Sequence, residues 1–306
     1  MLTRLRNGLA RVGAVVAAFG LAGCATGDGG TAPGAALTAA EARPALWQVS
    51  DEDTTVYLFG TIHTLPPGTQ WRSARLNEAM AASGELVTEV VVEDPMVPVQ
   101  AMMRLGRGQN LPPILERVPE ERRAALRAAI EASGLPMAHY DALDTWAASL
   151  TLISVTFARA GFDPALGVEP VLTQEFTARQ RPRRGLETFE EQFGFFDSMP
   201  ESEQREFLLG ALESETEMRS ELAQMVEAWR SGDVGALDRT FNDADLSPRL
   251  RDVLLTRRNA GWADWIHNRM NQPGTVFLAV GAGHLAGEDS VRELLKRRGF
   301  RVRRVQ

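Results

Sequence analysis

Two β-rich segments near opposite ends of the chain each stop at a glycine and place a histidine three residues later. The first reads TVYLFGTIH and ends at His63, and the second reads TVFLAVGAGH and ends at His284. Glycine lets the backbone leave a strand sharply, because it has no Cβ. A sheet that brings these strands together would place two imidazoles at one edge. The other two histidines, His139 and His267, lie in no such motif and are expected to be structural.

Each of these segments starts a β-loop-α-β unit. In the first unit, a hairpin formed by strands 46–50 and 54–59 around an acidic turn precedes a helix over 73–82 and a strand over 85–93. In the second unit, the predicted elements are a strand over 276–280, a loop over 281–287, a helix over 289–298 and a strand over 300–305. The two units are consistent with an old duplication, although the histidine offsets differ by one residue. A chance similarity of two strand-loop units is the alternative.

The region between the units predicts helices. Apolar residues recur at helical spacing in three stretches, around residues 146–157, 207–229 and 250–266, which indicates core packing. Residues 183–187 are the one further candidate strand. Nearly continuous apolar strands such as 85–93 favour a parallel sheet covered on both faces. The predicted fold is therefore α/β, with a mixed, largely parallel central sheet flanked by helices and a long helical middle segment.

The first 23 residues predict a lipoprotein signal peptide. Three arginines precede the short apolar stretch 12–20, and LAGC follows and ends at Cys24. This tetrapeptide resembles the bacterial lipobox, whose cysteine carries the lipid. The alternative is a signal anchor with an incidental cysteine. Residues 24–43 then form a flexible tether, and 44–306 form one domain. By resemblance to sorting rules, Ala25 indicates the periplasmic face of the outer membrane.

Charge and cysteine content exclude several classes of function. The chain has 33 basic and 40 acidic residues, and loss of the three leader arginines leaves 30 against 40. An acidic body argues against nucleic-acid partners and against adhesion to anionic lipid. Cys24 is the only cysteine, so an internal disulfide and a free catalytic thiol are both excluded. The sequence also has no HExxH, GxSxG or P-loop motif.

The two motif histidines suggest a divalent metal site that still needs a carboxylate. Imidazole is a common ligand of transition metals, and a catalytic ion usually has a third protein ligand and one open position. Three glutamates are candidates: Glu89, Glu169 and Glu187. Each has a simpler alternative reading. Glu89 is then an exposed residue of an edge strand, Glu169 a first-turn helix acid and Glu187 a solvated loop acid.

The ordered set of motifs resembles the TraB/GumN family, which includes the Tiki metalloproteases. The matching segments are LW at 46–47, YLFGTIH at 57–63, GVE at 167–169, GLET at 185–188, RN with a following tryptophan at 258–262, and VGAGHL at 280–285. The resemblance implies a fold similar to the erythromycin esterase and ChaN group. It also implies an active site with His63, His284 and Glu89 as metal ligands. Glu187 and Arg258 match further motif positions.

Two functions follow as hypotheses. The first is a membrane-tethered, metal-dependent hydrolase acting on a peptide or small molecule, with an ion of the manganese, cobalt or zinc type. Glu187 or Glu169 would be the general base, and Arg258 would stabilise the oxyanion; the alternative for Arg258 is an ion pair with a nearby glutamate. The second is a haem- or iron-binding lipoprotein without hydrolytic activity, using the histidines or a tyrosine, Tyr57 or Tyr140. A non-catalytic envelope factor is a third possibility.

Overall fold

The computed structural model describes residues 42–212, 215–242 and 248–306. The predicted signal peptide, Cys24 and the tether up to residue 41 lie outside the described residues, so these features remain predictions. Within the described ranges, no helix combines the length and the hydropathy that crossing a bilayer requires.

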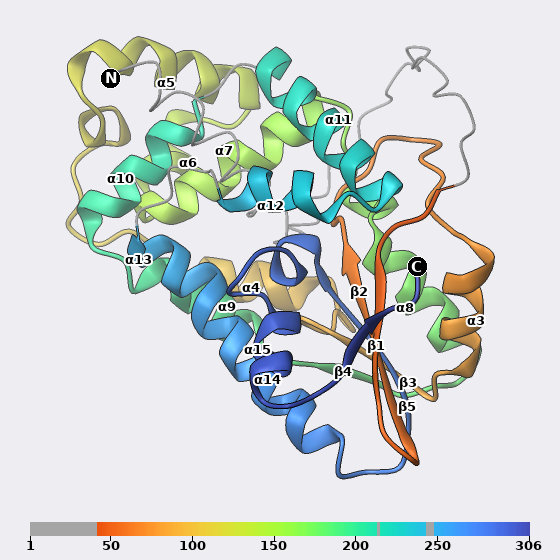
Figure 1. Ribbon diagram of the computed structural model, residues 1–306. Coiled ribbons are helices and arrows are strands. Elements are labelled where there is room, and N and C mark those ends of the chain that lie inside the picture. The colour runs from red at the N-terminus through yellow and green to blue at the C-terminus, as the bar shows by residue number, and fades with distance from the viewer. Residues whose placement is uncertain (1–41, 213–214, 243–247) are drawn as a thin grey trace.

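A six-stranded mixed sheet forms the centre of the domain (Figure 1). Its strands are β1 (Leu46–Ser50), β2 (Thr54–Thr61), β3 (Glu85–Thr88), β4 (Arg183–Gly185), β5 (Gly274–Gly281) and β6 (Val302–Arg304). Their order across the sheet is β4-β3-β5-β2-β1-β6. The four strands β4, β3, β5 and β2 run parallel, whereas β1 is antiparallel to both β2 and β6. The predicted fold class and the predicted hairpin are confirmed.

The two histidine-bearing strands, β2 and β5, are direct neighbours. They pair in parallel along their whole length, with Tyr57 opposite Phe277 and Thr61 opposite Gly281. Gly60 therefore lies opposite Val280, and the one-residue offset between the two motifs persists in the register. Both strands end at the same edge of the sheet, the carboxyl edge, where ligands bind in open α/β sheets.

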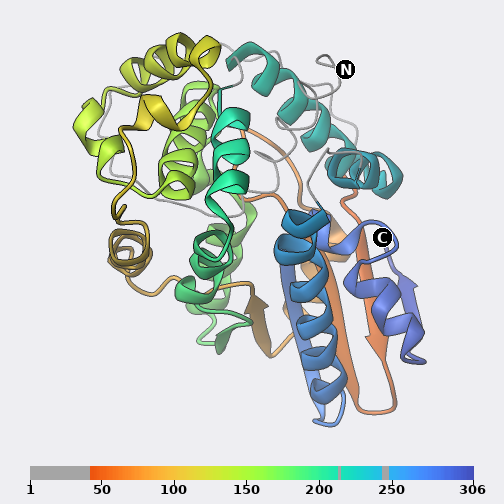
Figure 2. The same ribbon diagram turned by 90° about the vertical axis from the view of Figure 1, so that its left-hand side faces the viewer.

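Helices cover both faces of the sheet. On one face lie α3 (Ala74–Ala82) and α8 (Val168–Ala178), and on the other lie α14 (Arg257–Arg269) and α15 (Val291–Arg297) (Figures 1 and 2). The fold also contains four short helices of 3-10 or π type: η1 (Ile114–Arg117), η2 (Pro164–Leu166), η3 (Asp252–Thr256) and η4 (Ala282–Leu285). Because the central strands are covered twice, β2 and β5 are apolar on both sides.

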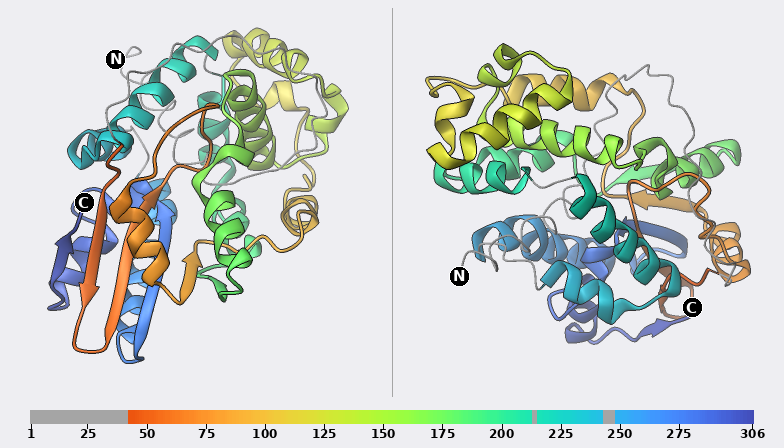
Figure 3. Two further views of the ribbon diagram at one scale, coloured as in Figure 1. Left: turned by 90° about the vertical axis from the view of Figure 1, so that its right-hand side faces the viewer. Right: turned by 90° about the horizontal axis from the view of Figure 1, so that it is seen from above.

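A helical lobe lies beyond the carboxyl ends of the parallel strands (Figures 1 and 3). Its helices are α4 (Met96–Leu105), α5 (Glu120–Ser133), α6 (Met137–Asp141), α7 (Thr145–Arg159), α9 (Phe189–Asp197), α10 (Glu201–Gly210), α11 (Glu215–Ser231), α12 (Val234–Asn242) and α13 (Pro248–Arg251). The three apolar stripes predicted from the sequence lie on these helices, on η3 and on α14, and most of their residues are buried.

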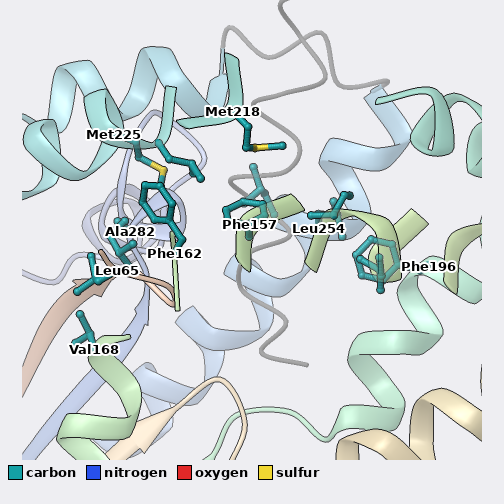
Figure 4. Close-up of a cluster of buried hydrophobic side chains, with 14 of the residues drawn as sticks. Leu65, Phe157, Phe162, Val168, Phe196, Met218, Met225, Leu254 and Ala282 are labelled. Carbon is teal, nitrogen blue, oxygen red and sulfur yellow. The ribbon is translucent and has the colours of Figure 1, made fainter. Parts of the chain in front are cut away.

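One apolar cluster joins the lobe to the site (Figure 4). It packs Leu65 and Ala282, which flank the two histidine turns, against residues of the lobe helices such as Phe157 and Met225. The backbone that carries the histidines is thus fixed from the side opposite the sheet.

The structure corrects the predicted strand over 85–93. The strand β3 ends at Thr88, and Glu89 begins a bend. The run of valines 90–92 predicts a strand because valine has a high β propensity. In the structure, the Glu89 carboxylate is held by Arg258 and by the Gly281 N–H, which lie on other elements. The predicted helix at 289–298 and strand at 300–305 are present in shorter form, as α15 and β6.

Removal of one buried hydrogen bond should weaken the contact between lobe and sheet. In α11, Trp229 is buried, and its Nε1–H donates to the carbonyl of Gly60 at 2.7 Å. We expect Trp229→Phe to lower the free energy of unfolding by about 1–3 kcal/mol, because the carbonyl loses its partner. Urea unfolding with an unchanged m-value would measure this. A loss below about 0.5 kcal/mol would show that the carbonyl finds another donor.

Candidate functional site

The site lies where β2, β3 and β5 end, and it brings together the three predicted ligands, His63, His284 and Glu89. The Nε2 atom of His63 is 3.9 Å from Oε1 of Glu89, and Nε2 of His284 is 3.8 Å from the same oxygen. The side chains of Glu89 and His284 are almost fully buried, and that of His63 keeps 13% of its surface exposed. The two motifs therefore converge on Glu89, and the alternative of an exposed Glu89 is wrong.

The orientation of His63 is set by Glu169 in the first turn of α8. Nδ1 of His63 lies 2.7 Å from Oε1 of Glu169, and the Thr61 hydroxyl donates to that same oxygen. This contact places the proton of a neutral imidazole on Nδ1, so that Nε2 has its lone pair turned into the site. Nε2 is buried and has no hydrogen-bond partner. Burial lowers the pKa of His63, but the neighbouring Glu169 outweighs it and the pKa is raised.

His284 is oriented by a neutral group instead. Its Nδ1 lies 2.7 Å from Oδ1 of Asn259, whose amide nitrogen donates to the carbonyl of Asp289. The amide oxygen therefore accepts the Nδ1 proton, and Nε2 of His284 again points into the site, 3.1 Å from Nη1 of Arg258. Burial and the nearby guanidinium lower the pKa of His284 to about 3, so this imidazole is neutral at ordinary pH.

Glu89 is a buried carboxylate with several donors. Oε1 accepts the backbone N–H of Gly281 at 2.8 Å, and Oε2 accepts from Arg258 at 2.5 Å and from the Gln192 amide at 3.3 Å. Burial alone would raise the pKa of Glu89. The charge of Arg258, the two imidazoles and the Gly281 N–H together lower that pKa to about 2. Glu89 is therefore ionised in the folded protein.

Arg258 is a fully engaged cation. Its Nε and Nη2 donate to Glu187, Nη2 also donates to Glu89, and Nη1 contacts the Leu254 carbonyl and His284. The guanidinium lies 4.8 Å from the Trp262 ring centroid and 5.8 Å from that of Phe195. A guanidinium has five N–H donors, so this set of contacts uses all of them. The alternative reading, an ion pair with a glutamate, is what the structure contains.

Glu187 is likewise saturated. Besides Arg258, it accepts the Trp262 indole N–H at 3.0 Å and the Gln192 amide at 3.2 Å. Burial raises the pKa of Glu187, and Arg258 opposes that shift. Only 9% of the Glu187 side chain is exposed, so the alternative of a solvated loop acid is wrong. By contrast, Oε2 of Glu169 is buried and has no partner, although 22% of the whole side chain is exposed.

The donor set fits a divalent metal ion in its chemistry, with one adjustment. Among the described residues, no group of three or more His, Cys, Asp or Glu side chains has the geometry to hold a metal ion as it stands. Two ligands of one ion with bonds of about 2.0–2.2 Å lie roughly 3–4 Å apart, and the two distances to Glu89 Oε1 are at the upper end of this range. His63 Nε2 is free, whereas His284 Nε2 would have to give up its contact with Arg258.

Glycine at position 281 keeps the space between the three side chains open. A Cβ on Gly281 would lie 3.0 Å from Nε2 of His63 and 3.2 Å from Oε1 of Glu89. It would also lie 3.5 Å from Cδ2 of His284. The motif glycine thus does more than permit a turn, because any side chain there would fill the centre of the site.

Sequence reasoning missed Gln192, which donates to both buried glutamates from α9. Asn259 and Trp262 were noted as motif residues, but their contacts with His284 and Glu187 were not expected. Nothing in the local pattern around Gln192, an amide among phenylalanines, marks it as part of the site. Tyr140 is fully buried and packs edge-on against His139, and Tyr57 is buried within β2.

The chain matches one family and several relatives. The sequence profile of the TraB/PrgY/gumN family matches residues 45–304. An uncharacterized protein of Treponema pallidum (strain Nichols) is 22% identical over 271 residues, which cover 82% of this chain and 80% of that protein. The uncharacterized protein YbaP of Escherichia coli (strain K12) is 24% identical over 249 residues, covering 78% of this chain and 87% of YbaP. No solved structure matches the chain significantly.

Proposed function

Because this chain belongs to the TraB/PrgY/gumN family, we propose that it is a metal-dependent hydrolase, with peptides as the expected substrates. One observation carries the proposal. Two imidazole nitrogens lie within 4 Å of one buried carboxylate oxygen, and one of these nitrogens is buried without a partner. An unpartnered buried nitrogen is costly unless a ligand satisfies it in the working protein.

In this proposal His63, His284 and Glu89 hold the ion. A bound ion would polarise the scissile carbonyl and lower the pKa of a bound water. The neighbouring residues prepare the three ligands. Glu169 and Asn259 fix both imidazoles with Nδ1 protonated and Nε2 inward, the role that outer partners of metal-binding histidines commonly have.

The contacts divide the three residues predicted to be catalytic into two groups. Arg258 keeps four of its five N–H groups on Glu187, Glu89 and the Leu254 carbonyl even when His284 turns to the ion, and the oxygens of Glu187 are all engaged. These two fit as positioning residues that hold Glu89 in place. Glu169 has an oxygen without a partner and borders solvent, so it is the better candidate to accept or return a proton.

A second candidate is a hydrolase that uses no metal. The 2.7 Å contact between Glu169 and His63 is also the arrangement in which a carboxylate orients a histidine that acts as general base. His63 Nε2 would then take the proton of an attacking water. The haem- or iron-binding alternative, with the histidines or a tyrosine as ligand, stays a prediction.

Metal removal separates these functions. We expect the purified protein to retain about one manganese, cobalt or zinc ion per chain, and to hydrolyse members of a mixed peptide library. Dialysis against a chelator should abolish hydrolysis, and return of the ion should restore it, because the ion supplies the electrophile. Elemental analysis and mass spectrometry of the peptides provide the measurements.

Hydrolysis that survives complete metal removal, but is lost in Glu169→Gln, would identify the metal-free hydrolase instead. Absence of both bound metal and hydrolysis, combined with a Soret band on addition of haem, would favour the binding protein.

A further inference from the structure

The C-terminal segment concentrates positive charge in an otherwise acidic chain. Between residues 292 and 304 there are seven basic residues and a single acidic one, whereas the whole chain has a net charge of −7. The basic residues are Arg292, Lys296, Arg297, Arg298, Arg301, Arg303 and Arg304. They extend from α15 through β6, which is the edge strand of the sheet.

Two of these seven cations form ion pairs, and a third lies over an aromatic ring. Lys296 pairs with Glu293, and Arg298 pairs with Asp264. Arg292 is half-buried and lies over the Trp47 ring, with 4.6 Å between its guanidinium carbon and the ring centroid.

Among the described residues, the remaining arginines form no ion pair with a side-chain carboxylate, and Arg304 also donates to the main-chain oxygen of Gln306. Arg297 donates to the backbone carbonyl of Glu288 at 3.1 Å, Arg303 donates to the amide oxygen of Gln48 at 2.9 Å, and Arg304 donates to the carbonyl of Gly232 at 2.8 Å. Arg301 is exposed. Because neutral acceptors leave the charge of a guanidinium in place, these side chains present positive charge to solvent along this edge.

The chain enters the fold at this same edge. The N–H of Arg43 donates to the carbonyl of Arg230 at 2.7 Å, and the Gln306 side chain donates to the Pro44 carbonyl at 2.7 Å. A Cβ on Gly232 would lie 2.5 Å from both the Arg43 carbonyl and Nη2 of Arg304. The first described residues, 42–44, therefore lie beside the C-terminal segment that contains β6.

We propose that the basic edge, comprising the exposed Arg297, Arg301, Arg303 and Arg304, docks onto an anionic phospholipid surface. Cationic side chains next to a membrane anchor are attracted to anionic headgroups by about 1 kcal/mol each. The tether from Cys24 to residue 42 spans at most about 60 Å, so a lipid on Cys24 would keep this edge near the bilayer. The net negative charge of the chain would argue against adhesion to anionic lipid if the charge were spread evenly. The charge is uneven, because seven basic residues lie between residues 292 and 304.

This inference does not rest on the proposed hydrolase activity. The docking surface includes β6, which is the edge strand opposite β4. It contains no residue of the His63 site. A single lipid chain gives only marginal membrane binding, and a basic surface is the usual second contribution.

Vesicle binding tests the proposal with a chain of residues 24–306 that carries Cys24→Ser. This chain keeps every described helix and strand, which all lie within residues 46–304. We expect it to co-float with vesicles of phosphatidylglycerol and phosphatidylcholine but not with phosphatidylcholine alone. Binding should fall as salt shortens the Debye length from about 10 Å at 0.1 M. The triple variant Arg297→Glu, Arg301→Glu, Arg303→Glu should bind about 100-fold more weakly.

The matched control reverses three exposed arginines elsewhere, Arg107→Glu, Arg123→Glu and Arg127→Glu, and changes the net charge by the same amount. We expect this control to retain most of the vesicle binding. Equal loss in both variants would overturn the proposal, since net charge alone would then explain the attraction. No binding of the parent chain to anionic vesicles would also overturn it, and the arginines would then serve only to protect an edge strand.

Discussion

Arg258→Ala should destabilise the protein by about 3–5 kcal/mol, the loss expected when one partner of a buried ion-pair network is removed. The side chain of Arg258 is 1% exposed and contacts Glu89 at 2.5 Å and Glu187 at 2.9 Å. Its removal leaves two buried carboxylates without their cation. Because the cost comes from unpaired charge and not from lost packing, Arg258→Lys should fall between Arg258→Ala and the wild type. Urea unfolding at neutral pH measures all three.

The control for this prediction is another arginine–glutamate pair of similar length. Arg104 and Glu190 are 2.7 Å apart, but their side chains are 62% and 45% exposed. An exposed pair of this kind contributes about 0–1 kcal/mol, so Arg104→Ala should have little effect. If Arg258→Ala cost no more than Arg104→Ala, the carboxylates would have to find other partners or take up protons, and the positioning role of Arg258 would be lost.

The sequence alone predicts the parts of the fold that depend on local patterns of apolar and turn residues. The hairpin, the strands β2 and β5, and the helix α3 follow from apolar periodicity and from turn residues. The meeting of His63 with His284 also follows, because parallel strands end at one edge of a sheet.

What the sequence could not give depends on contacts between distant elements. The apolar run after Glu89 has strong strand propensity, yet β3 stops at Thr88. The Glu89 carboxylate is bound by Gly281 and Arg258 from other parts of the chain. Arg258 was expected to face a substrate, but its donors are all taken within the protein. Its Nη1 reaches the Leu254 carbonyl inside the π-helical turn of η3, a local deviation that no periodicity predicts.

The same contacts explain why two histidines in matching motifs are not equivalent. His63 faces a carboxylate, which raises its pKa, whereas His284 faces an amide and a guanidinium and has a pKa near 3. His63 is also the more exposed of the two. The sequence places both imidazoles at strand tips, but only their partners distinguish His63, whose pKa is raised, from His284, which stays neutral.

Gly281→Ala should weaken metal binding and hydrolysis by about 100-fold while leaving the protein folded, since displacements of this size at a site can cost about that factor. The added methyl group would lie 3.0 Å from His63 Nε2 and 3.2 Å from Glu89 Oε1, so the imidazole and the carboxylate must move apart by a few tenths of an ångström. Calorimetric titration with manganese, cobalt and zinc measures the affinity, and thermal unfolding confirms the fold.

The matched control is the same substitution at Gly261, in the helix that carries Arg258 and Asn259. A Cβ there meets nothing within 4 Å, and alanine in a helix is favoured over glycine by about 0.5–1 kcal/mol. Gly261→Ala should therefore bind metal as the wild type does and be slightly more stable. Undiminished metal affinity in Gly281→Ala would mean that no ion lies between the three side chains. If that variant also hydrolysed peptides normally, catalysis would have to be assigned to a different arrangement of the site, with His63 and Glu169 as its first candidates.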